Sequence, residues 1–206
     1  MLSLIKRHIS QQRIDKTISV IEAGDLPALL KLLPKLDADW LNQPKANTPS
    51  LLELSITAQQ PTLVEQLINA GADPNQTGLK HESLLVLALQ QPAQRLALIT
   101  LLMKGGAKPQ GLATVKACFD HCPEKELMLH LNRLEQYGVD LTLVDSQGNS
   151  ALQYALASNN RELMHFLVSS GAPLPDEWPT TLDEELKAYL TRCAEDRRIR
   201  LMMLGP

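Results

Sequence analysis

Two cysteines spaced one helical turn apart are the most reactive pair of side chains in the sequence. Cys118 and Cys122 stand four residues apart, with His121 and His130 nearby. Thiolates and imidazoles bind zinc, and a structural zinc site needs four such ligands in a tetrahedral arrangement. One hypothesis is therefore a small metal-dependent or thiol enzyme that uses these residues. The leading alternative is that the cysteines only pack between helices, where buried cysteines are common.

The common signatures of catalytic and nucleotide-binding sites do not occur in the sequence. It holds no G-x-G-x-x-G, no P-loop, no H-E-x-x-H and no G-x-S-x-G. The segment "GGAK" at 105–108 follows an expected helix instead of opening one, so its glycines are interpreted as a helix stop. The sequence therefore predicts a protein that is not an enzyme, with no catalytic residue, no cofactor and no metal site.

Composition and charge limit the class of partner and the cellular compartment that we expect for the protein. The 206 residues are 44% hydrophobic and carry a formal net charge of −3, so the chain lacks the excess of cations that attracts nucleic acid. Lys6 and Arg7 interrupt the opening "MLSLI" before an export signal can form, and no apolar run reaches the ~18 residues of a membrane span. We therefore expect a cytoplasmic protein whose partner is neither nucleic acid nor membrane.

Three segments of the chain end in nearly the same way. They read "LINAGADPNQ" from Leu67, "LMKGGAKPQ" from Leu102 and "LVSSGAPLP" from Leu167. In each, an apolar helical run stops at a glycine, which enters the left-handed backbone conformation at a helix end without steric cost. A proline follows two or three residues later and prevents the helix from resuming. The repeated phrase is therefore a helix ending.

The spacing of these endings predicts a repeat array. Gly71, Gly106, Gly138 and Gly171 follow one another at intervals of 35, 32 and 33 residues. A period of this length is typical of units that each bury their apolar face against the neighbouring unit. Each unit is expected to hold two helices, such as 51–58 and the apolar run before Gly71.

Serine caps are expected to start the first helices of two units. Ser50 with Glu53, and Ser150 with Gln153, form the S-x-x-E/Q pattern, in which each side chain satisfies a backbone N–H near the other residue. Both pairs lie directly before an apolar run. The sequence therefore predicts a capping box at the start of each of these helices.

These segments resemble the ankyrin repeat family. "GNSALQYAL" from Gly148 is similar to the start of an ankyrin unit, and "LINAGADPN" is similar to its ending. Glu53, Val86 and Gln153 stand where the family has a histidine. The resemblance implies an all-α solenoid that binds another protein along a concave face and has no catalytic activity.

The repeat pattern can be extended in both directions over nearly the whole chain. We expect residues 1–206 to form a single ankyrin-repeat domain of about five helix-turn-helix units. Residues 1–12 are expected to form an N-terminal cap helix, residues 13–177 the repeats, and residues 178–206 the C-terminal cap helices. Ile199, Leu201 and Met202 are expected to fold back onto the last repeat.

The resemblance also places the candidate contact residues. All but Trp40 lie in the loop tips or, within the first helices, two positions after the key leucine, where the family's side chains face the concave side. Trp40 is a candidate because aromatic residues make up only 3% of the chain, and its alternative is a place in the interior of the first repeat. An alternative for Leu54 and Leu87 is that they pack against the next repeat. The candidate partner-binding residues are Trp40, Asn42, Lys45, Asn47, Leu54, Thr77, Leu79, His81, Leu87, Asp145, Gln147 and Tyr154.

The function predicted from the sequence is protein binding without catalysis. The partner is another protein, and a narrower hypothesis makes the chain an inhibitor or immunity-type partner of an enzyme or toxin. The competing hypothesis is the metal- or thiol-dependent enzyme built on Cys118 and Cys122.

Overall fold

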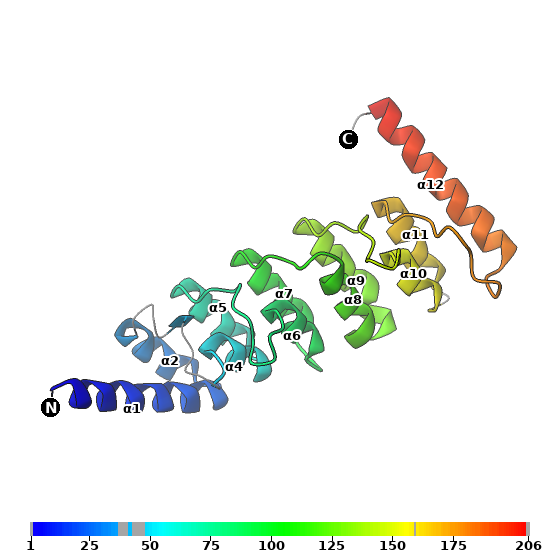
Figure 1. Ribbon diagram of the computed structural model, residues 1–206. Coiled ribbons are helices and arrows are strands. Elements are labelled where there is room, and N and C mark those ends of the chain that lie inside the picture. The colour runs from blue at the N-terminus through cyan, green and yellow to red at the C-terminus, as the bar shows by residue number, and fades with distance from the viewer. Residues whose placement is uncertain (1, 37–40, 43–47, 159, 205–206) are drawn as a thin grey trace. The chain divides into compact units, whose positions relative to one another are not determined.

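The computed structural model describes residues 2–36, 41–42, 48–158 and 160–204, with side chains from residue 12 onward within these ranges. The regular elements of the described residues are helices, apart from two isolated β-bridges (Figure 1). The chain divides into two compact units, Met1–Lys108 and Pro109–Pro206. Among the described helices, none is both long and apolar enough to cross a membrane.

The first unit consists of paired helices in two layers. α4 packs between α1 and α6 in one layer, and α5 packs between α2 and α7 in the other. Each hairpin therefore gives one helix to each layer, as expected for stacked repeats. The helices of this unit are α1 (Leu2–Glu22), α2 (Leu26–Leu32), the short 3-10 helix η1 (Leu33–Lys35), α4 (Leu51–Thr57), α5 (Pro61–Asn69), α6 (Leu84–Gln90) and α7 (Arg95–Lys104).

The second unit repeats this arrangement and adds one long helix. α8 packs on α10, α9 packs on α11, and α12 packs on the other side of α11 from the repeats. The helices of this unit are α8 (Leu112–His121), α9 (Glu124–Gln136), α10 (Ala151–Leu156), α11 (Arg161–Ser170) and α12 (Glu184–Leu204).

Each unit has its own apolar core. In the first unit, Leu52, Leu67 and Leu102 are fully buried between the two helix layers. In the second unit, Leu152 and Leu167 hold the corresponding places and are also fully buried. Burying an apolar side chain of this size stabilises a fold by about 1.5–3 kcal/mol, so these leucines hold the hairpins together.

The predicted helix endings are confirmed. The four glycines that set the repeat period have φ angles between +83° and +103°. The residue after each glycine donates its N–H to the carbonyl oxygen five residues earlier, as Ala72 does to Leu67 and Ala172 does to Leu167, both at 2.9 Å. This is the Schellman pattern of hydrogen bonds, and it satisfies carbonyl groups that a helix end leaves open.

The two serine caps differ in how they are completed. The backbone N–H of Ser150 donates to Gln153 Oε1 at 2.9 Å, within a complete capping box. Ser50 Oγ accepts from the N–H of Glu53 at 3.0 Å, but Glu53 Oε1 accepts from the backbone N–H of Leu79 in the next hairpin. The prediction of a reciprocal box at Ser50 is therefore wrong, because the Glu53 carboxylate links two repeats instead.

Both ends of the chain differ from the sequence-based expectation. α1 runs without interruption from Leu2 to Glu22, so the expected boundary between residues 12 and 13 falls inside one helix. At the other end, the expectation that the last apolar residues fold back onto the repeat is wrong, because Ile199, Leu201 and Met202 are exposed.

α12 extends past the repeat on which its first half packs. The division of 1–206 into caps and repeats stays a prediction.

Candidate functional site

The hairpin tip before α6 is a structured loop in the first unit. An isolated β-bridge joins Thr77 to Ser83, and the N–H of Gly78 donates to the carbonyl oxygen of Glu82 at 2.9 Å. His81 sits in the left-handed region with φ of 62°, which a tight turn requires. Leu79 is 48% exposed. The tip therefore holds an apolar side chain and an imidazole in fixed positions on the surface.

The Glu53 side chain, on α4, packs against this tip and accepts a hydrogen bond from it. This side chain is 9% exposed, and Glu53 Oε1 accepts from the N–H of Leu79 at 3.0 Å. A Cβ atom added at Gly78 would lie 3.1 Å from the same oxygen, so the tip sits directly on the carboxylate. Glu53 is not among the site residues expected from the sequence. The available signal was its position, where the ankyrin family has a histidine.

Two asparagines form a ladder between successive repeats. Asn42 Nδ2 donates to the carbonyl oxygen of Gly71 at 3.0 Å, and Asn42 Oδ1 accepts from the N–H of Asp73 at 2.7 Å. Asn75 makes the same two bonds, to Gly106 at 3.1 Å and from the N–H of Lys108 at 2.7 Å. Asn42 therefore joins repeats and is better described as a structural residue than as a partner contact.

The remaining candidate partner-binding residues of the first unit differ in whether the structure describes them and in how far they are buried. Trp40, Lys45 and Asn47 lie outside the described residues. Leu54 is half-buried on α4. Leu87 is only 8% exposed and belongs to the core, which favours the packing alternative for this residue because α6 is covered by the neighbouring helices.

The second unit carries an aspartate-centred tip before α10. Asp145 Oδ1 accepts from the N–H groups of Gln147 and Asn149, both at 2.8 Å. Asp145 Oδ2 accepts from Asn149 Nδ2 at 2.9 Å and from the Tyr154 hydroxyl at 3.2 Å. The side-chain hydrogen bond from Asn149 is the main cause that lowers the pKa of Asp145, so its carboxylate stays ionised. Gln147 is exposed at the end of the tip.

Tyr154 forms an aromatic pair on the first-helix layer. Its ring centroid lies 5.7 Å from that of Phe119 on α8, at an interplanar angle of 46°. One turn earlier on α8, Lys116 Nζ lies 2.6 Å from Asp120 Oδ2. Loss of solvent around the Tyr154 hydroxyl is the main cause that raises its pKa, which keeps the hydroxyl protonated as a donor to Asp145. Tyr154 is among the residues expected from the sequence, whereas Phe119 is not, because none of the quoted ankyrin-like segments includes α8.

The cysteine pair is packed inside the second unit. Cys118 is fully buried and Cys122 is 8% exposed. A hydrogen bond with Cys122 and burial both raise the pKa of the Cys118 thiol well above its usual value. A nucleophile requires the thiolate, so burial and the raised pKa work against that role for Cys118. His121 is exposed, and His130 is buried with Nδ1 2.8 Å from the carbonyl oxygen of Glu126. Among the described residues, no three acidic, histidine or cysteine side chains converge on a metal position.

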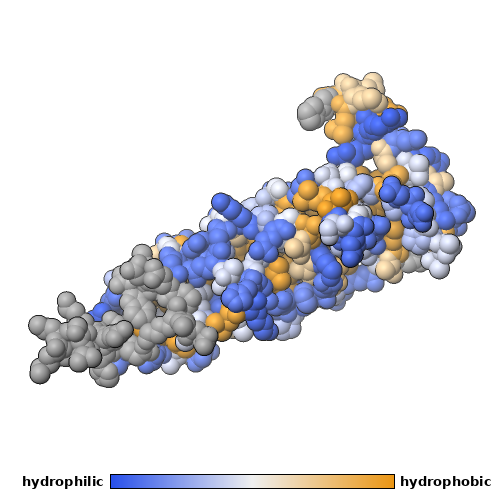
Figure 2. Space-filling view, in the orientation of Figure 1, coloured by the Kyte–Doolittle hydropathy of each residue, from blue (hydrophilic) through white to orange (hydrophobic). Residues whose placement is uncertain are grey.

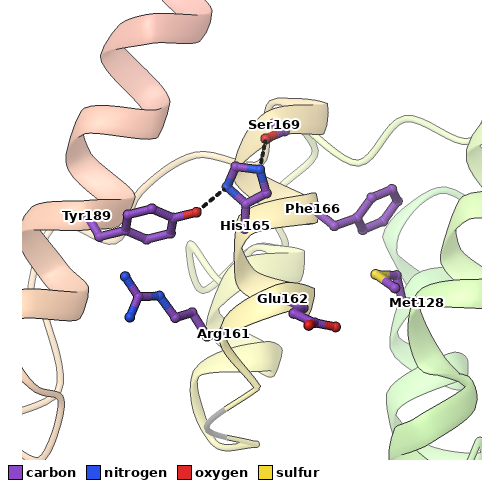
Figure 3. Close-up of a pocket in the computed structure, with 7 residues that line it drawn as sticks. All are labelled: Met128, Arg161, Glu162, His165, Phe166, Ser169 and Tyr189. Atoms are coloured by element: carbon purple, nitrogen blue, oxygen red, sulfur yellow. Dashed lines mark hydrogen bonds between the residues drawn. The ribbon is translucent and has the colours of Figure 1, made fainter.

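A groove that sequence analysis did not anticipate lies between α9, α11 and α12 (Figure 3). The Arg161 guanidinium lies 4.4 Å from the centroid of the Tyr189 ring, and the Tyr189 hydroxyl lies 3.0 Å from His165 Nδ1. The volume is about 570 Å³. The groove forms because α12 packs beside α11. The sequence predicts a capping helix within residues 178–206, but not which side chains of α11 it leaves open. Its lining residues are Met128, Arg161, Glu162, His165, Phe166, Ser169 and Tyr189.

Comparison with known proteins identifies the fold. No family model matches the chain, and a search of curated proteins finds no match. Among solved structures, the chain is similar to the crystal structure of the ankyrin repeat domain of Bcl-3, a unique member of the IkappaB protein family. The two chains share 20% identity, with a TM-score of 0.63 over 86% of this chain and 85% of that one. The described residues therefore have the all-α ankyrin-repeat fold predicted from the sequence.

Proposed function

We propose that the protein is a non-catalytic module that binds another protein through its hairpin tips and first helices. The observation that carries this proposal is the half-buried aromatic pair of Tyr154 and Phe119, held in place by Asp145 and flanked by the Lys116–Asp120 ion pair. Aromatic anchors surrounded by polar groups carry most of the binding energy in protein interfaces.

The tip of the first unit supports the proposal with a second surface. Leu79 and His81 project from a loop that the Thr77 bridge and the Glu53 carboxylate already hold in one conformation. An ordered loop loses little conformational entropy when a partner binds, which favours affinity. Leu54 is half-buried on α4, the helix from which Glu53 supports the tip.

The proposed contact set therefore differs from the set expected from the sequence. Asn42 and Leu87 are left out, since one joins repeats and the other is in the core. Trp40, Lys45 and Asn47 stay predictions. The residues proposed as contacts are Leu54, Thr77, Leu79, His81, Phe119, Asp145, Gln147 and Tyr154.

The proposal includes the cellular compartment in which the protein acts. None of the three cysteines, all within the described residues, forms a disulfide, which supports a reducing compartment such as the cytoplasm.

In a narrower form of the proposal, the partner is an enzyme or toxin that the protein inhibits. That form is tested by adding the purified chain to the captured partner and measuring the partner's activity, which should fall in proportion to the complex formed.

The test is a comparison of tagged variants in capture from the native host. Tyr154→Ala and Leu79→Asp each alter a proposed contact, whereas Leu129→Asp changes an exposed leucine on α9, in the other helix layer. We expect a stoichiometric partner that Leu129→Asp retains and Tyr154→Ala loses at least tenfold. A partner held equally by all three variants would contradict the proposed surface.

A further inference from the structure

α12 extends past the helix on which it packs. Its first half is held against α11 by the buried side chains of Leu186 and Leu190, and Arg197 Nε donates to the carbonyl oxygen of Ser169 at 3.1 Å. Residues 198–204 follow this contact and are all exposed, and we call them the overhang. In Figure 1 this end of α12 projects away from α11.

The overhang is mostly apolar. Leu201 and Leu204 continue the same helical stripe as Leu190 and Arg197, at spacings of three and four residues. The five exposed apolar side chains are distributed around the helix and together expose an area on the order of 500 Å², comparable with the largest apolar patch of a typical monomer, which is often functional. Figure 2 shows apolar residues at this end of α12. The five are Ile199 (46% exposed), Leu201 (41%), Met202 (68%), Met203 (79%) and Leu204 (82%).

The groove between α9, α11 and α12 offers a surface for such an overhang. Tyr189, near the start of α12, forms one wall, and Met128 and Phe166 supply apolar atoms on the other side (Figure 3). Met128 is 43% exposed in the chain alone. The groove and the overhang thus lie at opposite ends of one helix. A second helix running antiparallel to α12 would bring its own overhang beside this groove.

The charges on α12 are self-complementary in that arrangement. Arg192, Asp196 and Arg200 alternate in sign along the side of α12 that carries Tyr189, at steps of four residues. When two copies of α12 run antiparallel about position 194, Arg192 of each copy faces Asp196 of the other. The same register sets Ile199 opposite Tyr189, so charge pairing and apolar burial agree.

We propose that two copies of this chain pair through antiparallel α12 helices, with the overhang of each copy covering the groove of the other. The interface is isologous, because every contact occurs twice about a two-fold axis. The side of each overhang that faces the partner and the two grooves bury on the order of 1,000 Å², near the lower limit for a specific protein interface. The pairing uses no residue of the partner-binding surface proposed above and does not depend on that proposal.

A lipid surface suits the overhang less well than a second copy. A helix that lies on an anionic membrane needs its cationic and apolar residues on opposite sides. Arg198 and Arg200 lie on nearly opposite sides of the helix, since two residues turn it by about 200°. Asp196, one turn before Arg200, adds a negative charge on the side that carries Arg200.

The first test measures the mass of the full chain by sedimentation equilibrium between about 5 and 200 μM, which detects a dimer with a dissociation constant in the micromolar range. We expect a concentration-dependent dimer, and Met203→Asp should weaken dimerisation at least tenfold. The matched control is Val144→Asp, another apolar residue that is exposed (52%) but lies outside the interface, and it should leave the dimer unchanged. A wild-type chain that stays monomeric at the highest concentration overturns the proposal.

The second test exchanges the charges. Asp196→Arg alone should weaken the dimer about tenfold, and Arg192→Asp combined with Asp196→Arg should restore it, because the pair is then re-formed across the axis with reversed signs. Failure of the double variant to restore the dimer argues against this register. A chain that is monomeric but sediments with vesicles containing anionic phospholipid would identify lipid as the occupant and overturn the proposal.

A third test asks whether overhang and groove meet. Met128→Asp blocks the groove and Met203→Asp blocks the overhang, and each variant alone should dimerise weakly. An equimolar mixture should form a heterodimer more readily than either variant pairs with itself, because one intact overhang then meets one intact groove. Equal association in all three samples contradicts this contact.

Discussion

The carboxylate of Glu53 links the first helix of one repeat to the hairpin tip of the next. Its bond to the Leu79 N–H is charge-assisted and largely shielded from solvent, and hydrogen bonds of this kind contribute about 1.5–3 kcal/mol. We expect Glu53→Ala to lower the free energy of unfolding by about 1–3 kcal/mol in urea titrations monitored by circular dichroism. Glu53→Gln keeps an acceptor oxygen and should cost clearly less. Equal losses in both variants would mean that the bond is not the cause.

Asp145 gives the second unit a pH-dependent contribution. Its pKa is lower in the folded chain than its ordinary value, so it stabilises the fold above that ordinary value. The contribution is lost as the pH falls through the lowered pKa. We expect Asp145→Asn to reduce the melting temperature at pH 7, and the difference from wild type to shrink between about pH 5 and pH 2. Asp176→Asn, at an exposed aspartate of the same unit, is the control. A constant difference across this range would refute the assignment.

At the scale of elements, the asparagine ladder aligns successive repeats. Asn75 bonds both the carbonyl oxygen of Gly106 and the N–H of Lys108, which end the next hairpin. We expect Asn75→Ala to cost about 1–3 kcal/mol of unfolding free energy, since two backbone groups lose their partner. Asn132→Ala, on the exposed side of α9, should change stability by less than about 0.5 kcal/mol. Similar losses at both positions would show that the ladder adds nothing.

At the scale of the molecule, the two units have separate cores. Leu52 and Leu152 are both fully buried, one in each unit, at corresponding repeat positions. Replacing such a leucine by alanine typically costs about 2–5 kcal/mol. We expect Leu52→Ala to raise hydrogen exchange mainly within residues 1–108, and Leu152→Ala mainly within residues 109–206, as measured by mass spectrometry. Equal effects on both units from either variant would show that the chain opens as one body.

The features that the sequence determined by itself are those governed by local rules. Glycine at a helix end enters the left-handed region more easily than other residues, and the spacing of four such glycines defines the repeat. The Ser150 cap was also predictable, because both of its partners lie within four residues. These signals were enough for the helical repeat fold, and the resemblance to ankyrin repeats added Tyr154 as a surface candidate.

Only the tertiary structure decided which of the remaining side chains reach the surface. Leu54 and Leu87 hold equivalent sequence positions, yet Leu54 is half-buried and Leu87 lies in the core, because burial depends on the neighbouring helices. Glu53 could have closed a local capping box but bonds the next repeat instead. The groove at Tyr189 and the overhang of α12 exist because α12 packs beside α11 and runs past its end. The sequence predicts a capping helix here, but which side chains it covers depends on contacts between elements distant in the chain, so the sequence alone could not place the groove or the overhang.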